Sequence, residues 1–70
     1  MINPQVKTFL TVCEKKSFTR AAVELYITPS AVLQQINALE KRLGVELVVR
    51  HRTGITLTAA GTYLEREGRD

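Results

Sequence analysis

The side chains best suited to chemistry in this sequence are amides and hydroxyls gathered between residues 30 and 37. Gln34 and Asn37 each carry an amide that donates and accepts hydrogen bonds, and Ser30 carries a hydroxyl. Amides of this kind match the donor and acceptor edge that adenine presents in the DNA major groove. Leu33 belongs to the same stretch and could contact the methyl group of a thymine. The pattern indicates reading of bases rather than catalysis.

Basic side chains form two local groups. Ten Lys and Arg against seven Asp and Glu leave a formal net charge of +3. Basic clusters on a small domain favour a polyanionic partner, although charge alone fits a solubilising surface equally well. The first group is Lys15, Lys16 and Arg20, and the second is Lys41, Arg42, Arg50, His51 and Arg52.

Catalysis and metal binding lack the residues they need. The chain has one cysteine, Cys13, and one histidine, His51, which cannot build a zinc site of the Cys/His type or an internal disulfide. A nucleophile and base made from this pair would have no supporting motif. The sequence therefore predicts a protein that is not an enzyme and binds no metal or cofactor. The cysteine usage predicts a cytoplasmic location, and no apolar run approaches the ~20 residues that span a membrane.

The elements that must position these residues begin with two helices. Asn3 and Pro4 are typical of a helix start, and three- and four-residue spacing then predicts a buried stripe of Val6, Phe9, Leu10 and Cys13. After a break, Thr19 is expected to cap a short second helix. Its inward residues are Ala21, Ala22 and Leu25, and Tyr26 and Ile27 end it.

A third helix should carry the amides. Thr28 and Pro29 predict its start, and Gly44 predicts its end after Leu43. Its expected buried stripe is Val32, Ile36, Leu39 and Leu43. The opposite face is nearly free of acid, which favours a nucleic-acid-reading face over a merely solvated one; it comprises Ser30, Leu33, Gln34, Asn37 and Lys41. Gln35, next to Ile36, is expected to point sideways.

A hairpin and a last helix follow. Residues 46–50 and 55–57 read as strands around a turn at 51–54, with His51 and Arg52 at the tip. Arg50 has two open roles, contact with DNA or an ion pair with Glu40 that clamps the third helix. Thr58 is expected to cap a helix that continues beyond Asp70, so that the chain is a piece of a longer protein. Tyr63 and Leu64 are expected to have little to pack against.

This order of elements predicts a mainly α winged helix-turn-helix, with a three-helix core, a two-stranded wing and the start of a long C-terminal helix. The expected DNA-binding domain is 1–58, with its helix-turn-helix segment at about 18–37 and its wing at about 46–57. Residues 59–70 are expected to begin the last helix. The residues expected to contact the DNA backbone or minor groove are Ser17, Thr19, Thr28, Pro29, Arg50, His51 and Arg52.

One series of residues runs through essentially the whole chain: residues 17–22, Leu25, residues 27–32, Gln35, Ile36, Leu39, Glu40, Leu43, Gly44, Leu47, Arg50, Leu57, Thr58 and Gly61. This series resembles the amino-terminal domain of LysR-type transcriptional regulators. The resemblance implies a bacterial cytoplasmic regulator that acts as a homodimer or homotetramer on double-stranded DNA. It also implies that the third helix enters the major groove, that the wing lies near the minor groove, and that residues 59–70 begin a dimerising linker. By the same resemblance, a small-molecule effector would bind a C-terminal domain absent from this chain. The family's base-contacting positions fall on Ser30, Leu33 and Gln34, and its phosphate-gripping positions on Ser17, Phe18 and Thr19.

Three positions depart from the family's usual pattern. Leu33 stands where a serine is usual, Val48 replaces a phenylalanine, and Thr53 occupies the place of a basic residue near the wing tip. An exposed Leu33 would favour the alternative function, a winged-helix module that binds protein and not DNA. A second alternative, the winged-helix head of a molybdate-type regulator, differs in the domain that follows Asp70.

Overall fold

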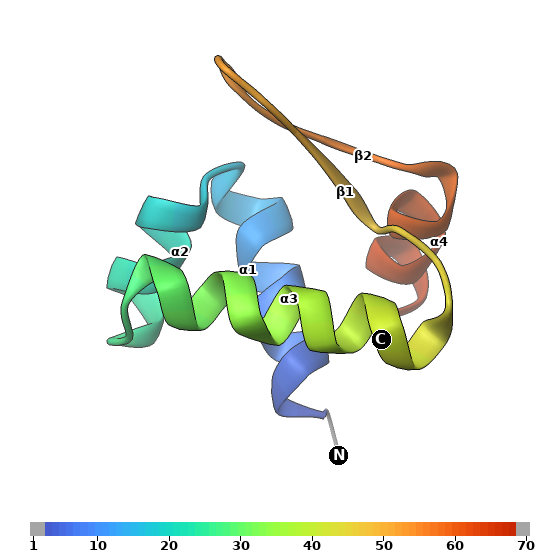
Figure 1. Cartoon of the computed structure of the whole chain (residues 1–70), viewed down its shortest axis with the longest axis horizontal. Helices are drawn as coiled ribbons and strands as arrows, with labels where there is room; N and C mark the ends of the chain where they lie inside the picture. The colour runs from blue at the N-terminus through green and yellow to red at the C-terminus, as the bar shows by residue number, and fades with distance from the viewer. Residues whose placement is uncertain (1–2, 69–70) are drawn as a thin grey trace.

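Three helices cross one another, and a hairpin rises from one end of the third (Figure 1). The computed structural model describes residues 3–68. Within them the chain forms helices α1 to α4 and a two-stranded antiparallel sheet, in the order α1 (Pro4–Lys15), α2 (Phe18–Leu25), α3 (Pro29–Leu43), β1 (Val48–His51), β2 (Gly54–Leu57) and α4 (Ala59–Gly68). The predicted winged helix-turn-helix is confirmed.

The predicted start of α1 and both predicted ends of α3 are also confirmed. The side chain of Asn3 accepts a hydrogen bond from the amide of Gln5 at 2.7 Å, and the hydroxyl of Thr28 accepts one from the amide of Ala31 at 3.0 Å. Gly44 ends α3 in the left-handed region at φ 75°, where glycine carries no Cβ penalty. Local capping chemistry therefore determines where these helices begin and end.

The predicted cap of α2 is wrong by two residues. Ser17, with extended backbone, accepts a hydrogen bond from the amide of Arg20 at 3.1 Å, and Thr19 lies inside the first turn. Lys16 by itself ends α1, because its backbone adopts the left-handed conformation at φ 56°. The segment between α1 and α2 is therefore shorter than expected, and Ser17 is free to cap α2.

The core lies where α1, α2 and α3 meet and extends to the loop before the wing. Phe9, Cys13, Ala21 and Ala22 are buried as predicted; the full buried apolar set is Phe9, Val12, Cys13, Ala21, Ala22, Val32, Ile36, Leu39 and Leu47. Val12 was not predicted, and it is buried because α1 packs against α2, α3 and α4 and so buries more than one stripe. The prediction for Leu43 is wrong: 49% of it is exposed, in the last turn of α3 at the end away from α2 (Figure 1).

A buried polar pair joins α1 to α3. Thr8 is only 3% exposed, and its hydroxyl pairs with the side-chain amide of Gln35 while lying 3.0 Å from the carbonyl of Pro4. Because a buried hydroxyl is costly without a partner, this pair favours one rotation of α3 against α1. Gln35 accordingly points toward α1, as its place beside Ile36 predicted.

The wing is shorter than predicted and is anchored at its base. β1 pairs with β2 from Val48 opposite Leu57 to His51 opposite Gly54. Residues 46 and 47 belong to the preceding loop and not to the strand, because Leu47 is buried and the amides of Leu47 and Val48 both donate to the Glu40 carboxylate, at 2.7 and 3.3 Å. His51 therefore sits within β1, where its ring pairs with the hydroxyl of Thr56, and Arg52 and Thr53 form the tip.

Helix α4 packs back onto the loop that precedes the wing. The hydroxyl of Thr58 accepts from the amide of Gly61 at 3.0 Å, which confirms the predicted cap. A Cβ on Gly61 would lie 2.1 Å from the Leu47 carbonyl oxygen, so only glycine allows this approach. Leu64, contrary to expectation, packs against the core, whereas Tyr63 is 64% exposed. The predicted continuation of this helix past residue 70 lies outside the described residues.

Within residues 3–68, none of the helices has the length and apolar character needed to cross a membrane.

Candidate nucleic-acid interface

The outer side of α3 is a polar ridge. Ser30, Gln34, Asn37 and Lys41, spaced four, three and four residues apart, are all exposed, and no acidic residue stands among them. Residues three and four apart are neighbours on a helix surface, so these side chains form one row. The structure thus brings together the predicted base-contacting amides and hydroxyl.

Leu33 borders this ridge on the side of the wing. It is half-buried and not freely exposed, and it lines a groove of about 420 Å³ between α3 and the wing. The groove wall mixes apolar side chains with amide and charged groups. Its lining residues are Phe18, Leu33, Ile36, Asn37, Glu40, Glu46, Val48, Val49 and Arg50.

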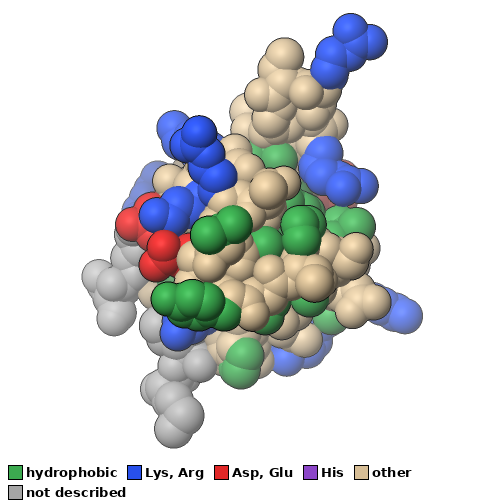
Figure 2. Space-filling view, turned by 90° about the vertical axis from the view of Figure 1, so that its left-hand side faces the viewer, with side chains coloured by type: hydrophobic (Ala, Val, Ile, Leu, Met, Phe, Trp, Pro, Cys, Tyr) green, Lys and Arg blue, Asp and Glu red, His purple; other side chains and the backbone are tan. Residues whose placement is uncertain are grey.

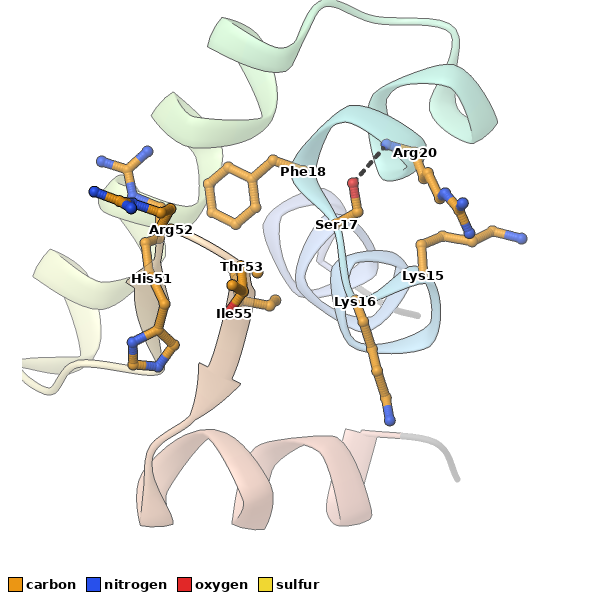
Figure 3. Close-up of a pocket in the computed structure, with 11 residues that line it drawn as sticks. Lys15, Lys16, Ser17, Phe18, Arg20, His51, Arg52, Thr53 and Ile55 are labelled. Carbon is orange, nitrogen blue, oxygen red and sulfur yellow. Dashed lines mark hydrogen bonds between the residues drawn. The ribbon is translucent and has the colours of Figure 1, made fainter.

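A second groove, of about 510 Å³, separates the start of α2 from the wing (Figure 3). It shares Phe18 and Arg50 with the first groove, so these two residues form a wall common to both grooves. Its lining includes the predicted contacts Ser17, Phe18, Arg50, His51 and Arg52, and also Lys15, Lys16 and Arg20. From the sequence, Lys15, Lys16 and Arg20 were identified only as a charged group. Their position beside Ser17, a predicted backbone contact, was the signal that could have placed them at this site.

The basic side chains around this groove do not converge. In Figure 3 Arg52 extends from the wing tip to the side away from Lys15 and Lys16, while the ring of Phe18 points across the groove toward the wing. Separated cations favour an extended polyanion over a single small anion, which would need its ligands gathered at one point. The first N–H groups of α2, next to Ser17, add partial positive charge at the same place.

Arg50 has a partner that the sequence did not indicate. Its guanidinium lies over the ring of Phe18, 5.7 Å from the ring centroid, within the range of a cation–π interaction. Among the described residues no ion pair joins Arg50 to Glu40, so of the two roles left open for Arg50 the clamp is wrong. The Glu40 carboxylate instead accepts hydrogen bonds from the backbone amides of Leu47 and Val48, where the loop enters β1.

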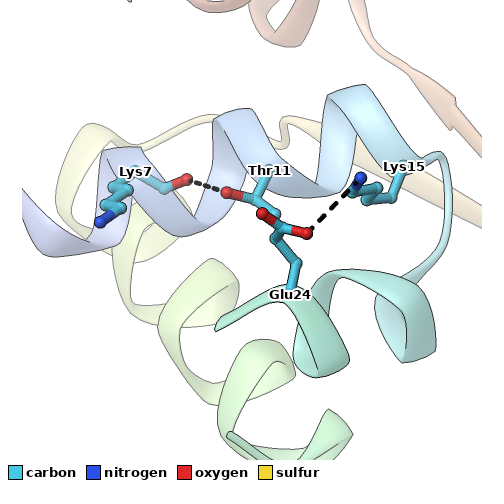
Figure 4. Close-up of polar contacts among 4 residues, drawn as sticks. All are labelled: Lys7, Thr11, Lys15 and Glu24. Atoms are coloured by element: carbon cyan, nitrogen blue, oxygen red, sulfur yellow. Dashed lines mark hydrogen bonds and ion pairs between the residues drawn. The ribbon is translucent and has the colours of Figure 1, made fainter. Parts of the chain in front are cut away.

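Acidic side chains are absent from the α3 ridge itself, although Glu40 and Glu46 line the groove beside it. On the face shown in Figure 2, acidic side chains lie at the left of the view, and basic side chains lie at the wing tip and at several other places. Lys15 forms an ion pair with Glu24, whose carboxylate oxygen lies 3.6 Å from the Lys15 Nζ (Figure 4). Exposed pairs of this kind contribute at most about 1 kcal/mol, but the pairing lowers the positive charge that Lys15 offers to a partner. Among the described residues, no ion pair lowers the positive charge of Lys16 or Arg20 in this way.

The remaining predicted contacts lie at the edges of this surface. Thr28 and Pro29 are exposed at the start of α3, and the Thr28 hydroxyl is already used as the helix cap. Thr19 is exposed in the first turn of α2. In residues 3–68 no cluster of three histidine, cysteine or acidic side chains is placed to hold a metal ion.

Comparisons with known proteins give one family. Residues 4–62 match the model described as "Bacterial regulatory helix-turn-helix protein, lysR family". The HTH-type transcriptional regulator HdfR of Escherichia coli O139:H28 is 54% identical over 59 residues, which are 84% of this chain and 21% of that protein. The chain thus spans about a fifth of the length of the curated relatives it matches.

Solved structures with the same fold include two close matches. A transcriptional regulator of the LysR family from Eggerthella lenta is 43% identical, with a TM-score of 0.89, over all of both chains. A complex of the CbnR DNA-binding domain with DNA is 38% identical, with a TM-score of 0.92, over 99% of this chain and 79% of that one.

Proposed function

The chain belongs to the LysR family of bacterial regulatory helix-turn-helix proteins, and on that premise we propose that it is a sequence-specific reader of double-stranded DNA in transcription regulation. The observation that carries the proposal is the acid-free ridge of α3, which adjoins the groove between α3 and the wing. An α-helix fits the major groove, and amides suit its base edges. The related CbnR domain, solved with DNA, supports the same reading.

The roles of the individual residues follow from their positions. Ser30, Leu33, Gln34 and Asn37 contact base edges from α3, which enters the major groove. Arg52 and Arg50 reach the adjacent minor groove or its phosphates from the wing, with His51 beside them. The backbone contacts at the helix starts are Ser17, Phe18 and Thr19 at α2 and Thr28 and Pro29 at α3, to which Lys16 and Arg20 are added.

The domain boundaries complete the proposal. Residues 1–58 form the DNA-binding unit, and residues 59–70 begin a linker through which a longer protein forms homodimers or homotetramers. An effector, where there is one, binds outside this domain, consistent with relatives about five times as long as the matched segment. The protein works in the cytoplasm, as DNA-binding regulation requires, and no catalytic step or cofactor is assigned to this chain.

The alternative of a protein-binding module without DNA depended on an exposed Leu33. That side chain is half-buried and lines the groove beneath the wing, so it is not the exposed anchor that this alternative required. No other observation favours this alternative.

A salt titration tests the proposal directly. Binding to the DNA upstream of the gene is measured by fluorescence anisotropy, with a scrambled duplex as control. Log Kd should rise linearly with log salt, with a slope of about 0.9 for each phosphate neutralised, and the upstream DNA should bind more tightly than the scrambled duplex. Equal and salt-independent binding of both duplexes would contradict it.

A further inference from the structure

Leu33 is an apolar side chain set into a polar helix face. Ser30 lies one turn before it and Asn37 one turn after it, and both are exposed. Gln34, the next residue, is exposed as well. Any base edge read by this face of α3 therefore meets a leucine beside hydrogen-bonding groups.

The wing side of Leu33 is held in place. Leu33 shares the wall of the groove between α3 and the wing with Phe18, Ile36 and Val48, and its half-buried state limits its rotamers. The rest of its surface remains exposed. A positioned apolar surface discriminates between ligands better than a mobile one, because less side-chain entropy is lost on contact.

We propose that Leu33 selects a thymine through its 5-methyl group, next to the base that Gln34 reads. The proposal rests on the DNA binding proposed above and specifies what the site recognises. The thymine methyl is the apolar group that base edges present in the major groove. A cytosine at that place has a C5–H where thymine carries its methyl group, so the apolar contact with the leucine is lost. Leu33 therefore favours thymine over cytosine.

The test removes the methyl and nothing else. A duplex is first selected from a randomised pool with the 70-residue chain, and each thymine in it is then replaced singly by deoxyuridine. At one position per bound half-site the replacement should weaken binding roughly three- to fivefold, the effect of returning one methyl group to water. In Leu33→Ala the same replacement should have no effect.

Asn37→Ala is the matched control, because it alters the same ridge one turn away and leaves the leucine in place. This variant should keep the full thymine-to-uracil difference while binding every duplex more weakly. The measured quantity is the ratio of the affinities of one protein for the thymine duplex and the deoxyuridine duplex. A smaller folded fraction of Leu33→Ala lowers both affinities equally and leaves this ratio unchanged.

Three outcomes are informative. A methyl effect present in the parent and Asn37→Ala and absent in Leu33→Ala supports the proposal. Selected sequences that bind tightly but show no methyl effect, or show it unchanged in Leu33→Ala, overturn it and leave DNA binding intact. A pool that yields no preferred sequence overturns the proposed function itself, and with it this inference.

Discussion

The guanidinium of Arg50 lies 5.7 Å from the centroid of the Phe18 ring, so β1 is held against the first residue of α2. The two residues are 32 positions apart in the chain and line both grooves of the interface. This contact links the wing to the helix-turn-helix, so the two parts that would contact DNA are oriented relative to each other.

The Arg50–Phe18 contact should contribute measurably to stability. Phe18→Leu keeps apolar volume but removes the aromatic face, and Arg50→Ala removes the cation. A double-mutant cycle of these changes, followed by urea unfolding, should give a coupling energy of about 0.5–1 kcal/mol. Additive effects of the two substitutions would show that the stacked geometry contributes nothing.

The Glu40 carboxylate should stabilise the base of the wing. Glu40→Ala leaves the amides of Leu47 and Val48 without their acceptor and should lower the free energy of unfolding by about 2 kcal/mol. Glu40→Gln retains a neutral acceptor and should cost about half as much. The matched control is Glu46→Ala, which removes a carboxylate from the same groove and should change stability by less than about 0.5 kcal/mol. Equal losses for Glu40→Ala and Glu46→Ala would refute this account.

Gly61 should not tolerate even alanine. The added Cβ would meet the Leu47 carbonyl oxygen at 2.1 Å, and backbone on both sides must move to relieve the clash. We expect Gly61→Ala to cost about 3 kcal/mol, much of the stability of so small a domain, and to lower the melting temperature followed by circular dichroism. Gly68→Ala meets only the flexible end of Leu10 at 3.3 Å and should stay within about 1 kcal/mol of the parent. A melting temperature for Gly61→Ala equal to that of Gly68→Ala would exclude the close approach.

Gln34 and Arg52 should affect DNA binding in different ways. Gln34→Ala should cost about 1–3 kcal/mol of discrimination at one base pair and leave the salt dependence nearly unchanged. Arg52→Ala should weaken binding to selected and scrambled duplexes alike and reduce the salt slope by about 1. Affinities measured on both duplexes over a range of salt separate the two effects. If Arg52→Ala changed sequence preference, or Gln34→Ala changed only the salt slope, the two roles would be exchanged.

The sequence alone was sufficient for the features that local chemistry controls. Asn3, Thr28, Gly44 and Thr58 act on backbone groups within four residues, so their effect is visible in a short window. Apolar spacing likewise identified Phe9 and Cys13 on α1 and three buried residues of α3, Val32, Ile36 and Leu39, because a helix repeats its orientation regularly. The acid-poor ridge of α3 could be predicted for the same reason. Apolar spacing missed Val12 and wrongly included Leu43.

Tertiary structure decided whatever depends on residues distant in the chain. Arg50 faces Phe18 because β1 passes over the start of α2, and Glu40 binds the loop before β1 because α3 ends beside it. Leu33 is half-buried and Leu43 is half-exposed, because the burial of each depends on the elements that pack beside it. A helical period gives the direction of a side chain relative to its own axis, but the element that packs on that side is set only when the helices and the wing assemble.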